Sequence, residues 1–185
     1  TALGDQANAN GNQSTAVGRG AKANACSSVA VGHAAIASGT RASAFGQGAN
    51  ASNADSVAIG YSSVGSGKLS TAIGSYANAT ASDSIAIGFL SYATAEDALA
   101  VGKSSIANKS NAIAIGTESK ATNVNATAFG DATQATGFQS TALGAGALAT
   151  KQNATAVGEK ANASGTQATA VGRQSLAKQS GTTAL

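Results

Sequence analysis

Small and bulky apolar residues alternate in short stretches that recur along the whole chain, as in Ser84-Ile85-Ala86-Ile87-Gly88. In every complete copy an alanine lies two residues before a glycine, and Leu, Val, Ile or Phe lies directly before it. Successive copies are 14 residues apart, with no insertion or deletion. Alternation with a period of two predicts a β-strand, and a strict repeat of this length is typical of a solenoid.

A second short strand is predicted after each glycine. The third and fifth residues beyond it are small, as in Ala49 and Ala51, and a larger, variable residue lies between them. Turn-forming residues such as Ser66-Gly67-Lys68 separate the strands. We therefore predict an all-β fold, a parallel β-solenoid with 14 residues and two short strands per coil. Residues 1–185 are expected to form a single repeat domain of about 13 coils.

A coil of two strands is too thin to enclose Ile or Phe, so we expect Ser84, Ala86 and Gly88 to lie inside and Ile85 and Ile87 outside. Each exposed Val, Leu or Ile forgoes about 1.5–3 kcal/mol, and the apolar surface would exceed the ~300–600 Å² patch of an ordinary monomer. We therefore predict an obligate homo-oligomer. Its interface residues would be Val29, Val31, Val57, Ile59, Ile73, Ile85, Ile87, Leu99, Val101, Ile113 and Ile115.

The outward positions of the second strand are largely polar and are expected to face water. They include Asn50, Asn78, Lys120, Gln134 and Asn162, whereas Tyr92, Ile106, Leu148 and Leu176 are exceptions. Candidate ligand-binding residues are Tyr61, Phe89 and Tyr92, together with other residues that directly follow a glycine, such as Arg19 and Arg173.

The composition argues against several functional classes. The formal net charge is +3 without a basic cluster, and aromatic residues are 4% of the chain. Nucleic-acid binding is therefore not expected. No apolar run approaches the ~20 residues of a membrane helix, and no secretory signal opens the sequence. Because the chain begins and ends within a repeat, we expect it to be a fragment, with any signal or anchor outside it.

No residue pattern predicts catalysis, a metal site or a cofactor. His33 is the only histidine and lacks a cysteine at metal-ligand spacing. Asp55, Asp83 and Asp97 share one repeat position near a turn and are interpreted as solvated turn residues. Cys26 is the only cysteine, so an intrachain disulfide is impossible; an inert small residue is favoured over an interchain bridge.

The copies Ser-Val-Ala-Ile-Gly at 56–60, Ser-Ile-Ala-Ile-Gly at 84–88 and Ala-Ile-Ala-Ile-Gly at 112–116 are each followed by small-x-Ala. This pattern resembles the YadA-like head domains of trimeric autotransporter adhesins over the whole chain. The resemblance implies a left-handed parallel β-roll, a homotrimer and display at the outer membrane of a Gram-negative bacterium. It also implies adhesion to host extracellular matrix proteins or host cells. Membrane attachment would come only through a C-terminal anchor that is absent from this chain.

Other solenoid functions remain open. An ice-binding solenoid would need flat ranks of threonine, and the chain offers one rank, interrupted in its middle: Thr127, Thr141, Thr155, Thr169 and Thr183. An acyltransferase on a left-handed β-helix would need an apolar residue every six positions, which a 14-residue period does not supply. A non-adhesive structural solenoid is a further alternative.

Overall fold

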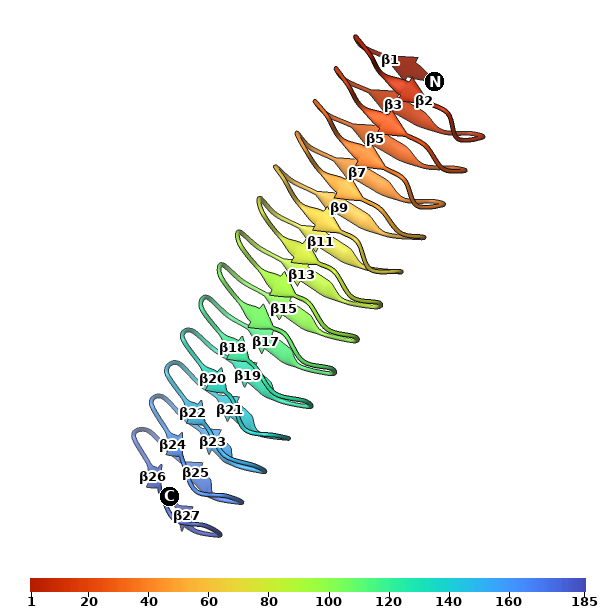
Figure 1. Ribbon diagram of the computed structural model, residues 1–185. Helices are drawn as coiled ribbons and strands as arrows, with labels where there is room; N and C mark the ends of the chain where they lie inside the picture. Colours follow the sequence, from red (N-terminus) through yellow and green to blue (C-terminus); the bar gives the residue numbers. More distant parts are fainter. The chain divides into compact units, whose positions relative to one another are not determined.

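A computed structural model describes residues 1–185 as an all-β chain of 27 short strands. The chain forms two compact units, Thr1–Thr94 and Ala95–Leu185. In each unit the odd-numbered strands build one sheet, the first sheet, and the even-numbered strands build the second sheet. Figure 1 shows the strands of each unit following one another as successive rungs. The predicted parallel β-solenoid fold is confirmed.

The strands have the following bounds. In the first unit, the first sheet contains β1 Ala2–Leu3, β3 Thr15–Val17, β5 Val29–Val31, β7 Ser43–Phe45, β9 Val57–Ile59, β11 Thr71–Ile73 and β13 Ile85–Ile87. Its second sheet contains β2 Asn8–Ala9, β4 Lys22–Ala23, β6 Ile36–Ala37, β8 Asn50–Ala51, β10 Val64–Gly65, β12 Asn78–Ala79 and β14 Tyr92–Ala93.

In the second unit, the first sheet contains β15 Leu99–Val101, β17 Ile113–Ile115, β19 Thr127–Phe129, β21 Thr141–Leu143, β23 Thr155–Val157, β25 Thr169–Val171 and β27 Thr183–Ala184. Its second sheet contains β16 Ile106–Ala107, β18 Lys120–Ala121, β20 Gln134–Ala135, β22 Leu148–Ala149, β24 Asn162–Ala163 and β26 Leu176–Ala177.

Within each unit, every strand pairs in parallel with its equivalent in the next coil, in a register of 14 residues. Thr71 lies opposite Ile85, for example, and Ala72 lies opposite Ala86. The pairing therefore aligns each repeat position into a column that runs from coil to coil. Alanine meets alanine inside, and bulky residues meet bulky residues outside.

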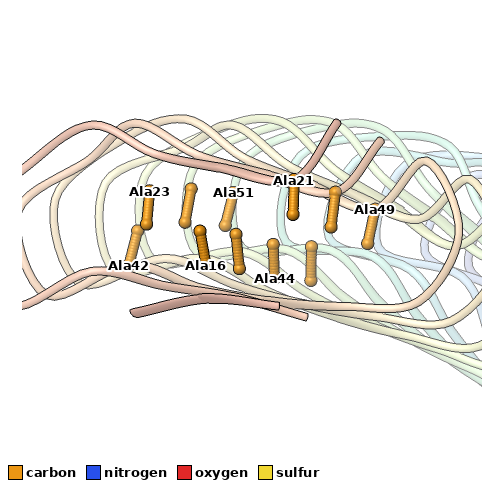
Figure 2. Close-up of a cluster of buried hydrophobic side chains, with 11 residues drawn as sticks. Ala16, Ala21, Ala23, Ala42, Ala44, Ala49 and Ala51 are labelled. Atoms are coloured by element: carbon orange, nitrogen blue, oxygen red, sulfur yellow. The ribbon is translucent and has the colours of Figure 1, made fainter. Parts of the chain in front are cut away.

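The interior consists almost entirely of alanine and serine. The alanines at the centre of the first-sheet strands, such as Ala16 and Ala44, have no solvent exposure, and neither do Ala23 and Ala51 of the second sheet. Figure 2 shows these side chains pointing toward one another from the two sheets. Ser84 and Ala86 are fully buried, whereas Ile85 and Ile87 lie outside. The predicted division between inside and outside is confirmed.

All buried serines except Ser14 bond to the carbonyl three residues earlier in their own turn. The Ser84 hydroxyl donates to Ala81 O at 2.6 Å, and the Ser70 hydroxyl donates to Gly67 O at 2.7 Å. A buried hydroxyl without a partner would cost about 1–3 kcal/mol. This local bond therefore allows serine to replace alanine in the core. The buried hydroxyl of Thr133 bonds to a different coil instead: it donates to Gly144 O of the next coil at 2.6 Å.

Two turns in each coil contain a residue in the left-handed conformation, and these residues recur every seven positions. Most are not glycine: Leu69, Tyr76 and Asp83 have φ values of 59°, 58° and 57°. Their amides are bonded to the preceding coil, as in Asp83 N to Lys68 O at 2.9 Å. None of the non-glycine residues in this conformation is Val, Ile or Thr. Stacking thus imposes left-handed backbone that β-branched side chains tolerate poorly.

The glycine after each first-sheet strand has a different constraint. Gly60 has φ of 132°, and a Cβ atom there would lie 2.5 Å from Gly74 O of the next coil. Both the backbone conformation and the close approach exclude other residues.

We predict that Ala132→Val lowers the free energy of unfolding by about 1 kcal/mol, because Ala132 lies in the left-handed conformation with φ of 50°. Ala145 is exposed like Ala132 and also lies in the turn after a first-sheet strand, but its backbone is not in the left-handed conformation. Ala145→Val should change the same free energy by less than about 0.5 kcal/mol. Urea unfolding followed by circular dichroism measures both. Equal effects would contradict the assigned backbone strain.

We also predict that Ala72→Leu destabilises the fold by about 1–3 kcal/mol or more, because the fully buried Ala72 lies between Ala58 and Ala86 in the first sheet. Ile73→Leu, on the adjacent outward position, should cost less than about 1.5 kcal/mol. Thermal unfolding compares the two variants. An Ala72→Leu protein as stable as the parent would show that the interior is wider than described.

Candidate interaction surfaces

The outward residues of the first sheet form an apolar face in each unit. In the first unit this face contains the predicted residues Val29, Val31, Val57, Ile59, Ile73, Ile85 and Ile87; in the second unit it contains Leu99, Val101, Ile113 and Ile115. The strand register places Ile59, Ile73 and Ile87 in one column, so each side chain covers part of its neighbour. Ile85 and Ile87 are each 37% exposed.

Because neighbouring side chains cover one another, exposure of the apolar face costs less free energy than the sequence alone suggests. Complete exposure would forgo about 1.5–3 kcal/mol per side chain, and exposure of about a third forgoes about 0.5–1 kcal/mol. In the first unit, Ile59, Ile73 and Ile87 belong to one continuous apolar column, and their exposed parts add up. A second column beside it is interrupted by Ser43 and Thr71. The apolar face therefore keeps a row of partly exposed apolar side chains in each unit.

An aromatic cluster lies in the turns that follow β9, β11 and β13. Tyr61 and Tyr76 pack edge to face with ring centroids 5.2 Å apart, and Tyr76 and Phe89 do so at 6.3 Å. Hydrogen bonding with Tyr61, together with burial, raises the pKa of Tyr76 above its ordinary value. The three rings remain 43–45% exposed. The structure thus brings two candidate ligand-binding residues together.

Tyr76 belongs to this aromatic cluster although sequence analysis did not select it. Tyr61 and Phe89 directly follow a glycine, whereas Tyr76 comes one residue later, in the left-handed position. Its ring lies between the rings of Tyr61 and Phe89 and packs against both. Because Tyr76 occupies a different position of the repeat, the sequence pattern does not group it with them. Tyr92, the third candidate, lies in β14 of the second sheet beside Asn78 and is not part of the cluster.

The outer face of the second sheet is less hydrated than predicted. Asn50, Asn78 and Asn162 are half-buried, and their side-chain oxygens have no hydrogen-bond donor. Asn50 pairs with Ile36 and Val64 in neighbouring coils, whose apolar side chains cover it. The expectation that these residues simply face water was wrong for their buried oxygens, because stacking places apolar neighbours on both sides.

A minority of the charged residues form ion pairs: Arg41 with Asp55 of the next coil, and Lys160 and Arg173 with Glu159. Arg41 donates to both carboxylate oxygens of Asp55 at 2.6 and 2.7 Å, and this hydrogen bonding lowers the pKa of Asp55. Asp83 and Asp97 occupy the same left-handed turn position as Asp55. Asparagine and aspartate are favoured in that conformation, which gives these aspartates a structural role.

The remaining residues singled out from the sequence lie in exposed turns. His33 follows Gly32 and is hydrogen bonded to Arg19, with 2.8 Å between Arg19 Nη2 and His33 Nε2. Cys26 is exposed. The structure contains no group of three or more His, Cys, Asp or Glu side chains that could hold a metal ion. It also contains no helix long and apolar enough to cross a membrane.

The repeat geometry has a direct counterpart among known families. The model of the YadA head domain repeat matches residues 1–21, 9–35, 23–48, 37–63, 66–91, 93–119, 121–147, 149–175 and 163–185. The chain belongs to the YadA head domain repeat family. The resemblance proposed from the sequence is therefore confirmed. No curated protein matches the chain.

Family membership makes the chain a head domain of the adhesin type. The YadA head is a non-enzymatic domain, in keeping with side chains that build turns and surfaces. Function in such a head must come from what its outer faces contact. The apolar face, the aromatic cluster and the outer face of the second sheet are the surfaces that this chain offers.

Proposed function

We propose that this chain is the trimeric head of a bacterial surface adhesin, displayed outside the outer membrane, which attaches to host extracellular matrix proteins or host cells. The observation that carries the proposal is the apolar face on a solenoid of YadA head repeats. One chain has no interior space for these side chains, because the core holds only small residues: alanine, serine, Gly65 and Thr133. Three chains that meet through their first sheets would cover them.

Trimer formation leaves other surfaces available. The turns and the second sheet project away from the proposed interface, since the two sheets of a coil have opposite outer faces. A trimer would therefore present three copies of each turn surface. Multivalent display strengthens attachment to a repetitive ligand without any new contact. Attachment would thus depend on assembly as well as on the contact residues.

The aromatic cluster is the proposed contact surface. Tyr61, Tyr76 and Phe89 are exposed and packed against one another, which limits the freedom that they lose on binding. Tyrosine and phenylalanine are enriched in protein interfaces. The cluster therefore combines exposed apolar area with two hydroxyl groups. Tyr92 offers a separate surface on the second sheet.

Ile115→Lys tests the assembly. We expect it to raise the concentration at which half of the chains are trimeric by at least about tenfold, because a charge would be removed from water at the interface. Gln134→Lys is the matched control: it is also half-buried but lies on the second sheet beside Lys120. Light scattering across a dilution series, with circular dichroism as a folding check, compares them. Trimer loss in the control alone would move the interface to the second sheet.

Alanine substitutions test the contact surface. Tyr61→Ala, Tyr76→Ala and Phe89→Ala are each expected to weaken binding per trimer about tenfold or more, as for central residues of an interface. The assay is solid-phase binding of the purified protein to matrix proteins and to host cells. Tyr92→Ala is the control and should bind like the parent.

Other results would contradict the proposal. Loss of binding only in Tyr92→Ala would place the contact on the second sheet. Loss of the trimer in the cluster variants, with binding per trimer intact, would place the cluster in the interface. Thermal hysteresis in the parent protein without attachment to any matrix protein or cell would favour the ice-binding alternative.

A further inference from the structure

A pocket of about 410 Å³ lies across the first three coils of the first unit. Its lining includes Arg19, Lys22 and His33, with Gly20 and Ala34 at the left-handed turn positions. Three coils beyond Ala34, the same turn position holds the large side chain of Tyr76. The hollow therefore exists because Gly20 and Ala34 are small. Its volume is within the ~300–1,000 Å³ of small-molecule sites.

The cationic side chains of this pocket are not neutralised by carboxylates. Arg41 and Arg173 pair with Asp55 and Glu159, whereas Arg19 and Lys22 make no ion pair. Asp5 also lines the pocket without pairing to either of them. Two unpaired cations in one hollow favour an anionic ligand.

The contact between Arg19 and His33 determines which of their nitrogen atoms can donate hydrogen bonds to a ligand. A guanidinium has only donors, so Arg19 Nη2 donates to His33 Nε2 across 2.8 Å. His33 is then the neutral tautomer with its proton on Nδ1, which is a further donor. The bond also holds Arg19 in place, and the other N–H groups of its guanidinium remain available. A fixed guanidinium suits a planar carboxylate or a sulfate.

We propose that this pocket binds an acidic sugar, a saccharide that carries sulfate or carboxylate groups. Arg19 and Lys22 bind the anionic group. The Gln6 amide and the Asp5 carboxylate, which line the same pocket, supply donors and acceptors for sugar hydroxyls. A pocket of this volume and mixed polarity fits a saccharide better than a lone inorganic anion.

This site adds one class of host ligand to the proposed adhesion. Binding of the saccharide does not depend on the proposed function, but its role in attachment rests on it. Lys22 extends from β4 of the second sheet, on the side opposite the apolar face. The pocket therefore stays accessible when the first sheets meet in a trimer. It is also separate from the aromatic cluster, which lies in the turns after β9, β11 and β13.

The single histidine of the chain makes the test specific. The His33 ring protons of residues 1–185 are followed by NMR during titration with a heparin-derived tetrasaccharide. A neutral tetrasaccharide and inorganic sulfate are titrated in parallel at the same ionic strength. We expect a saturable shift of the His33 signals with the acidic tetrasaccharide, none with the neutral one, and at least about tenfold weaker binding of sulfate.

Two arginine variants provide the matched comparison, because Arg19 and Arg173 both directly follow a glycine and both are exposed. Arg19→Ala should weaken tetrasaccharide binding about tenfold or more, since it removes charge-assisted hydrogen bonds. Arg173→Ala, which removes an arginine paired with Glu159, should bind within about twofold of the parent. Calorimetry measures both, and circular dichroism checks that each variant is folded.

The proposal is overturned by the absence of a saturable shift, by equal losses in the two variants, or by sulfate binding as tightly as the tetrasaccharide. These outcomes are separable from failure of adhesion. A protein that attaches to matrix without binding the tetrasaccharide keeps the proposed function and loses this site. A protein that binds the tetrasaccharide without attaching to matrix or cells keeps the site and loses the proposed function.

Discussion

The close approach of the two sheets governs the rest of this molecule. Four inward positions of each coil hold residues as small as alanine and serine, and the fully buried side chains are nearly all of these two types. A larger residue would force the sheets apart or distort their parallel pairing. Val, Leu, Ile and Phe are therefore displaced to the outer faces. The same constraint gives the fold its stability and leaves it with apolar surface that another chain can cover.

The turns adapt to this stacking. Two left-handed residues in every coil allow each turn to lie directly on the preceding one, with its amide bonded to that turn, as in Ser27 N to Asn12 O at 2.8 Å. The backbone demand is met by many side chains, provided that they are not β-branched. The turn columns can therefore vary freely in chemistry. They hold an aromatic cluster at Tyr61, Tyr76 and Phe89, and a cationic hollow at Arg19 and His33.

The sequence predicted the strands, their parallel register, the alanine interior and the family, because a fixed period aligns equivalent residues whatever the details of the turns. It did not predict the two left-handed positions of each coil, since residues such as Leu69 and Tyr76 carry no glycine signal. The grouping of Tyr76 with Tyr61 and Phe89 escaped for the same reason. The hollow beside Arg19 depends on the absence of large side chains at Gly20 and Ala34, which no motif in the sequence indicates. The burial of Asn50 by Ile36 and Val64 likewise depends on the next coil.

A thin alanine interior forces the bulky residues outward, and we propose that association of chains then covers them. Sedimentation equilibrium of residues 1–185 at micromolar concentration tests it most directly, with circular dichroism to confirm β-structure in the same samples. The predicted result is a single folded species with the mass of three chains. A folded monomer at that concentration would show that the outward apolar residues do not require association.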